Sequence, residues 1–202
     1  MEPRFVSLRE AGRLSKKMAS RLQKKYKEEI VPKMMERFKI TNVMAVPHLE
    51  KIVISMGLGK SIGDPKIIES AVQDLTMISG QKPIVTKAKE AISNFKLKEK
   101  APIGCVVTLR RARMFEFLDR LVNVSLPRIR DFNGISRTSF DKQGNFSLGI
   151  VEQSVFPEID SGKILHVQGM NITFVFNKGP KEQTMELLSF LGMPFHVLAK
   201  KL

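Results

Sequence analysis

The run Gly57-Leu58-Gly59-Lys60-Ser61 is the part of the sequence most suggestive of catalysis, because it ends like a nucleotide-binding phosphate loop. Such a loop also needs a glycine five positions before the glycine that precedes the lysine, so that the backbone can wrap the phosphates. That position holds Ile54, and the next helix signal comes only at Asp64-Pro65. The run therefore indicates a glycine-rich turn after a strand, and nucleotide hydrolysis is disfavoured.

No other group of side chains favours catalysis. Cys105 alternates with apolar residues, which favours a buried structural thiol over a nucleophile, and a single cysteine excludes an internal disulfide. Glu158 and Asp160 lie in FPEID, where carboxylates beside a proline are more often solvated or helix-capping than catalytic. The histidines are scattered, with no cysteine or carboxylate at metal-ligand spacing: His48, His166 and His196. We expect a binding protein with no cofactor, metal or small-molecule substrate.

The charge of the chain is strongly positive and unevenly placed. Its 202 residues contain 34 Lys+Arg against 20 Asp+Glu, a net charge of +14. Residues 1–40 hold 12 basic and 5 acidic side chains, and residues 82–137 hold 13 and 5. Solubility needs no such segregation, whereas a polyphosphate backbone is a common partner of clustered basic residues. No apolar run approaches the roughly 20 residues of a membrane span, and no signal peptide is evident, so we expect a soluble intracellular protein with no membrane partner.

Hydrophobic periodicity predicts about five strands and four helices. Strands are predicted at residues 49–58, 83–87, 103–110, 146–152 and 167–177. Helices are predicted at residues 16–39, 64–80, 111–126 and 180–192. The lysine-rich segment 88–102 is expected to be a loop or hairpin tip, and 127–147 a long irregular excursion. This order predicts an α+β, two-layer fold with one mixed, mostly antiparallel sheet and helices on one face.

The strand pattern also predicts what the uncovered face of the sheet presents. In the strands at 49–58 and 103–110, every second residue is apolar and is expected to face the core. The alternate positions include basic and hydroxyl side chains: Lys51, Ser55, Thr108 and Arg110. Such groups suit a sugar-phosphate surface, so the sequence predicts an RNA-binding face.

Five segments, in order, resemble one protein family. They are VMAVPHLEKIVISMGLG (43–59), ISGQKPIVTKAKEAISNFKL (78–97), PIGCVVTLR (102–110), LPRIRDFNG (126–134) and FPEID (156–160). Together they are similar to bacterial-type large-ribosomal-subunit protein five, the 5S-rRNA-binding family of the central protuberance. The resemblance extends from about Tyr26 to Phe195.

The resemblance implies a structural protein of translation that binds 5S rRNA and attaches it to the large subunit, beside 23S rRNA and other central-protuberance proteins. In the family the 5S contact centres on an asparagine, a glutamine and a threonine. Gln81 and Thr108 match two of these, whereas Ser55 stands at the asparagine position. Serine still donates and accepts hydrogen bonds but is shorter, which leaves that one contact open.

Two further contacts follow from the resemblance alone. The family's loop that reaches the P-site tRNA matches 88–102, which carries four lysines: Lys89, Lys96, Lys98 and Lys100. A merely solvated loop remains an alternative for these lysines. The family's bridge to a small-subunit head protein matches about 127–145, where three arginines either serve the bridge or bind 23S rRNA: Arg128, Arg130 and Arg137.

We therefore expect one ribosomal domain at residues 21–195, a basic N-terminal extension at 1–20 and a C-terminal tail at 196–202. The expected place is the ribosome of the bacterial cytoplasm, in preference to an organellar ribosome, because no convincing transit segment is visible. Two rivals remain. A free RNA chaperone or RNA-modifying accessory factor would bind many structured RNAs alike, and an enzyme acting on nucleotides would need a titratable cluster that the sequence lacks.

Overall fold

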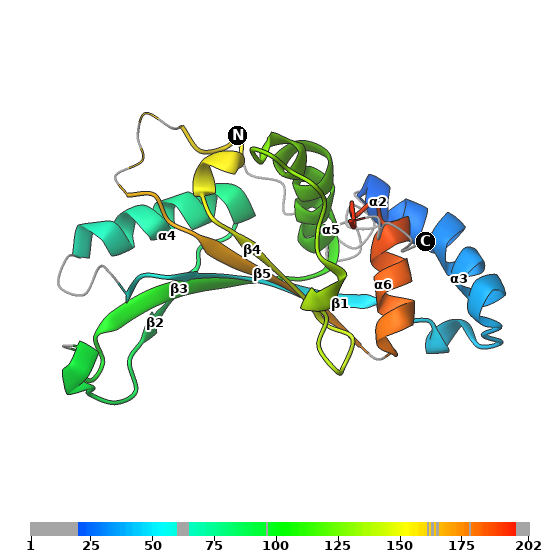
Figure 1. The fold of residues 1–202 in the computed structure, drawn as a ribbon, viewed down its shortest axis with the longest axis horizontal. Coiled ribbons are helices and arrows are strands. Elements are labelled where there is room, and N and C mark those ends of the chain that lie inside the picture. Colours follow the sequence, from blue (N-terminus) through cyan, green and yellow to red (C-terminus); the bar gives the residue numbers. More distant parts are fainter. Residues whose placement is uncertain are drawn as a thin grey trace, which may run out of the picture.

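The protein is built on five strands in which buried and exposed side chains alternate. The computed structural model describes residues 20–59, 65–95, 97–160, 162, 164, 166–177 and 179–196. The strands are β1 (Leu49–Gly57), β2 (Ile84–Lys87), β3 (Pro102–Leu109), β4 (Phe146–Ile150) and β5 (Met170–Phe176). They form one open sheet in the order β2-β3-β1-β5-β4 (Figure 1). The five predicted strands are confirmed, and every pair of neighbours is antiparallel, where a mixed, mostly antiparallel sheet was expected.

Within the described residues the helices confirm the predicted pattern and add two π-helical turns, whereas the start of the helix predicted at 16–39 lies outside those residues. The bounds are α2 (Arg21–Lys25), a π-helical turn at Tyr26–Ile30, α3 (Val31–Phe38), α4 (Pro65–Ser79), α5 (Arg111–Arg120), a π-helical turn at Leu121–Ser125, and α6 (Lys181–Phe190). Single 3-10 turns lie at Val43–Ala45, Ser93–Phe95, Leu126–Arg128, Arg137–Ser139 and Gln153–Val155. Pro32 lies in the first turn of α3, directly after the first π-helical turn. A proline lacks the N–H that would continue the α-helical ladder, which accounts for the change of helix type there.

The core lies between one face of the sheet and the helices. Ile52 and Ile54 of β1 are fully buried, as are Leu75 of α4 and Phe117 and Leu118 of α5. α4 and α5 lie on the same side of the sheet, and α2, α3 and α6 gather at one end of it (Figure 1). The opposite face of the sheet carries no helix of the described chain, as the predicted two-layer fold requires. No helix within the described ranges is long and apolar enough to cross a membrane.

The excursion between α5 and β4 is irregular, as predicted, and it is fastened to the end of the chain. The backbone N–H of Ile135 donates to the carbonyl of Pro194 over 2.9 Å, and the N–H of His196 donates back to Ile135 over 2.9 Å. The Phe140 ring packs against the ring of Phe146 at 4.7 Å and that of Phe195 at 5.9 Å, measured between centroids. These contacts hold the excursion beside α6 and the start of β4.

Candidate nucleic-acid interface

The register of the sheet arranges the uncovered face as rows of side chains across the strands. Residues directly opposite each other in an antiparallel pair point to the same face. One row is Thr108, Val53, Thr173 and Ser147, from β3 to β4. The next is Ile84, Val106, Ser55, Asn171 and Gly149, from β2 to β4. The face is therefore a mixture of small hydroxyls, one amide and aliphatic groups.

Ser55 and Thr108 lie on this one face, as the sequence predicts. They are diagonal neighbours, because Ser55 pairs with Val106 and Thr108 pairs with Val53. Both side chains are half-buried, in contrast to Ile54, which points into the core and is fully buried. Lys51 is opposite Val175 of β5 and shares the face, so it adds a positive charge beside the hydroxyls.

Gln81 lies in the segment that leads into β2, and Arg110 lies between β3 and α5. Ile84 pairs with Val106 in antiparallel fashion, which places the residues before β2 beside those that follow Val106. The side chain of Arg113, in the first turn of α5, donates to Oε1 of Gln81 over 3.3 Å. Arg110 forms an exposed ion pair with Glu50 at 3.1 Å, so part of its charge is locally compensated. The structure thus places Thr108 and Arg110 at the end of β3, whereas the side chain of Gln81 is bonded to α5 through Arg113 and is not among the paired residues of the open face.

Sequence reasoning missed the polar side chains of β4 and β5. Asn171, Thr173 and Ser147 are on the open face in the same rows as Ser55 and Thr108. The hydroxyls of Ser147 and Thr173 are 3.2 Å apart and hydrogen-bonded. The period-2 pattern of β5 carried the signal, because Asn171 and Thr173 alternate with the buried Ile172 and Phe174.

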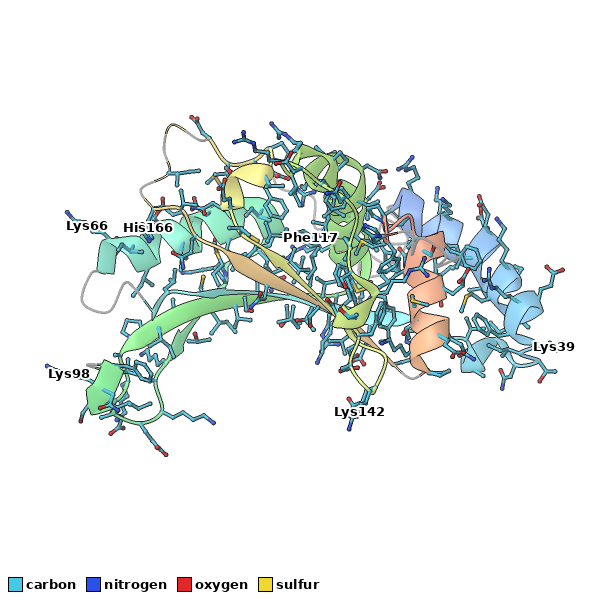
Figure 2. The ribbon with its side chains drawn as sticks, viewed as in Figure 1. Lys39, Lys66, Lys98, Phe117, Lys142 and His166 are labelled. Carbon is cyan, nitrogen blue, oxygen red and sulfur yellow. The ribbon has the colours of Figure 1, made fainter. Side chains whose placement is uncertain are left out.

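The predicted tRNA-contacting lysines lie on the hairpin between β2 and β3, which turns away from α4 (Figure 1). The N–H groups of Ile92 and Leu97 each donate to the other residue's carbonyl at 3.0 and 3.1 Å, which closes the tip between β2 and β3. Lys98 projects at the far end of the molecule (Figure 2), and Phe95 at the tip is 69% exposed. The other described lysines, Lys89 and Lys100, are exposed too. Lys96 lies outside the described residues.

The three predicted arginines of the excursion are exposed. Arg128 lies in the 3-10 turn after α5, Arg130 follows it, and Arg137 begins the next 3-10 turn. They are spread along the excursion, so the structure does not gather them at one point of the chain. Lys142, in the turn before β4, lies below the sheet on the side away from α4 (Figure 2).

The residues weighed as catalytic prove to be structural where they are described. Burial raises the pKa of the Cys105 thiol to about 11, and the negative charge of Asp74 adds to this, so the thiol stays protonated. Glu158 forms an ion pair with Arg120, and Asp160 accepts from the backbone N–H of Gly162 over 3.1 Å. No cluster of three or more His, Cys, Asp or Glu that could hold a metal occurs within the described ranges. Lys60 and Ser61 lie outside those ranges.

Comparison with known proteins agrees with this geometry. Two family models match, "Ribosomal protein L5" over residues 42–98 and the model for the C-terminus of the same ribosomal family over residues 102–195. Large ribosomal subunit protein uL5 of Clostridium acetobutylicum is 55% identical over 178 residues, which are 88% of this chain and 99% of that protein. The uL5 proteins of Clostridium beijerinckii and Clostridium tetani are each 56% identical, over 87% and 88% of this chain and 98% and 99% of their own lengths. The chain therefore belongs to the ribosomal protein L5 family, and it is a structural constituent of the large ribosomal subunit in translation and not an enzyme.

Proposed function

We propose that the open sheet face of this ribosomal protein binds 5S rRNA and helps to attach it to the large subunit in the central protuberance. One observation carries this proposal. The side chains of Ser55 and Thr108 occupy a face that no described helix covers, and Gln81 lies in the segment that leads into β2, the edge strand of the same sheet. Hydroxyl and amide groups on an uncovered sheet face suit the wide, shallow minor groove of an RNA helix, which displays 2′-hydroxyls and base edges.

The charged and the uncharged side chains of the face are proposed to make different kinds of contact. Lys51 and Arg110 sit at the margin of the hydroxyl rows and attract phosphates, whereas the rows themselves supply direction-dependent hydrogen bonds. The proposed 5S contact therefore depends on salt only in part. Selectivity for one RNA comes from the uncharged groups, because phosphate contacts carry little sequence information.

The hairpin between β2 and β3 is proposed as the contact to the P-site tRNA. Its exposed lysines give a contact that is sensitive to salt and largely blind to sequence. The hairpin extends away from the helices that surround the core (Figure 1), so its tip is free to reach an RNA other than the one on the sheet.

The excursion is proposed to serve the bridge to a small-subunit head protein, or to bind 23S rRNA through its arginines. Its backbone is held at Ile135 by Pro194 and His196, between the exposed Arg130 and Arg137. The proposed domain is residues 21–195, with the basic segment 1–20 and the tail 196–202 as additions, and the proposed place is the ribosome of the bacterial cytoplasm.

A filter-binding competition tests the 5S assignment. Labelled 5S rRNA is bound to the full chain at fixed salt and challenged with unlabelled 5S rRNA or with an unrelated structured RNA of equal length. We expect the unrelated RNA to compete at least about tenfold less well, because specific sites exceed the non-specific electrostatic background. Equal competition by the two RNAs would favour the rival function, a free RNA chaperone or accessory factor.

A further inference from the structure

We infer that Ser55 and Asn171 form one RNA-recognition unit on the open face, in which Asn171 of β5 supplies the amide and Ser55 of β1 the hydroxyl. The inference rests on the proposed 5S-binding function and adds a site residue that the sequence analysis did not contain. It also extends the interface from β1 and β3 to β5.

The two residues are held together by the register of the central strands. Ser55 is directly opposite Asn171, so the two side chains leave the sheet on the same face. Side chains paired in this way have Cβ atoms about 5 Å apart, which is close enough to contact the same nucleotide. On its other side Asn171 is opposite Gly149, which has no side chain.

The Asn171 amide has no structural task within the described chain. Its side chain is exposed, and no hydrogen bond joins it to another described residue. Two nearby asparagines differ: Oδ1 of Asn145 accepts from the N–H of Phe176 over 3.1 Å, and Oδ1 of Asn177 accepts from the N–H of His48 over 2.9 Å. Those two amides hold the backbone, whereas the Asn171 amide is free to bind a ligand.

The neighbours of Asn171 leave room for a ligand. A Cβ added at Gly149 would lie 3.5 Å from Oδ1 of Asn171, so a side chain there would cover part of the amide that the glycine leaves open. Ser55 is short, and Val106 beyond it cannot donate or accept a hydrogen bond through its side chain. The Asn171 amide therefore lies between the short side chain of Ser55 and Gly149, which has no side chain.

The chemistry of the pair fits RNA. Among the described strand residues of the open face, Asn171 has the only amide side chain, which both donates and accepts, and Ser55 adds a hydroxyl that does the same. An RNA minor groove presents 2′-hydroxyls, which donate and accept, and base edges dominated by acceptors. A pair of this kind can engage a 2′-hydroxyl and the adjacent base edge together, which a lone serine cannot.

Filter binding of purified variants to 5S rRNA at fixed salt tests the unit. Asn171→Ala and Asn171→Ser are each expected to weaken binding about twofold to tenfold, the effect of one net hydrogen bond. The double variant Ser55→Asn with Asn171→Ser moves the amide to the facing strand and is expected to recover most of the loss. Asn94→Ala, at an exposed asparagine of the hairpin tip, is the matched control and should bind like the parent chain.

The possible outcomes separate this inference from the proposed function. If Asn171→Ala binds like the parent while Thr108→Ala is weakened, the inference is overturned and the 5S assignment stands. If neither variant is weakened, the 5S assignment itself fails. A double variant that binds as weakly as Asn171→Ser also overturns the inference, because an amide at position 55 would then fail to replace the amide at position 171. Urea unfolding midpoints equal to that of the parent chain verify that each variant is folded.

Discussion

The side chain of Gln153 donates a hydrogen bond to the carboxylate of Asp74 over 3.4 Å, although 79 positions separate the two residues. Both side chains are buried. The same amide nitrogen donates to the carbonyl of His166 over 2.8 Å, and Gln168 donates from its side chain to the carbonyl of Gly57 over 2.6 Å. One buried glutamine thus fastens α4 to the segment that leads into β5. The same segment meets the end of β1 through the bond from Gln168 to Gly57, next to the antiparallel pairing of β1 with β5.

The buried carboxylate makes stability depend on pH. Burial raises the pKa of Asp74 above its value in the unfolded chain, while the hydrogen bond from Gln153 opposes this. The folded chain therefore holds this proton more tightly. The associated stability is fully present below the ordinary carboxyl pKa and is lost as the pH rises through the folded-state pKa. Asp74→Asn removes the free-energy cost of burying an ionised carboxylate and keeps an oxygen that accepts the hydrogen bond from Gln153.

We expect the Asp74→Asn variant to gain stability relative to the parent chain as the pH rises from acid to neutral. Urea unfolding midpoints measured at several pH values check this. Glu152→Gln, at an exposed carboxylate, is the control and should follow the parent curve. A difference between Asp74→Asn and the parent that is the same at every pH would contradict the assigned cause.

Arg120 connects two parts of the core by a second long-range contact, and its loss should destabilise the fold. It forms an ion pair with Glu158 and donates to the carbonyl of Ile78 over 3.0 Å. The other carboxylate oxygen of Glu158 is buried without a partner in the described chain. Arg120→Met should lower the free energy of unfolding by about 1–3 kcal/mol, because a partly buried carboxylate loses its main partner. Urea denaturation measures this. Arg120→Met with Glu158→Gln should be less destabilised than Arg120→Met alone, and equal losses would show that the pair does not interact.

Local patterns were sufficient for part of the site. Ser55 and Thr108 were assigned to one face because alternation along a single strand fixes which side chains point away from the core. The position of Asn171 was beyond such reasoning. Its strand was predicted, but its place opposite Ser55 follows from the pairing of β1 with β5, which are far apart in the sequence. The hydrogen bond from Gln153 to Asp74 likewise results from packing between segments that are distant in the sequence. The residue periodicity within one strand or helix cannot predict such a contact.

The open face should combine contacts that differ in their dependence on salt. Thr108→Ala is expected to weaken 5S rRNA binding about twofold to tenfold with an unchanged slope of log affinity against log salt, because a hydroxyl displaces no counterion. Lys51→Ala on the same face should weaken binding and reduce that slope by roughly one. Filter binding over a salt series checks both, and Lys98→Ala on the hairpin should leave the 5S affinity nearly unchanged. A flatter slope for Thr108→Ala and an unchanged slope for Lys51→Ala would contradict the assignment of a salt-independent contact to Thr108 and a phosphate contact to Lys51.

The tip of the hairpin should contact tRNA partly by stacking. Phe95 is 69% exposed and Ile92 is 44% exposed at this tip, beside the lysines. Aromatic side chains stack on unpaired bases with about 1–3 kcal/mol per base, and this energy depends little on salt. Phe95→Ala is therefore expected to weaken P-site tRNA binding by ribosomes that carry the variant, with a loss that persists at raised salt. Phe95→Tyr retains the ring and should bind tRNA like the parent, whereas the loss caused by Lys98→Ala should fade as salt is added. Unchanged tRNA binding by both Phe95→Ala and Lys98→Ala would leave the hairpin as a solvated loop, because neither its ring nor its charge would then take part in the contact.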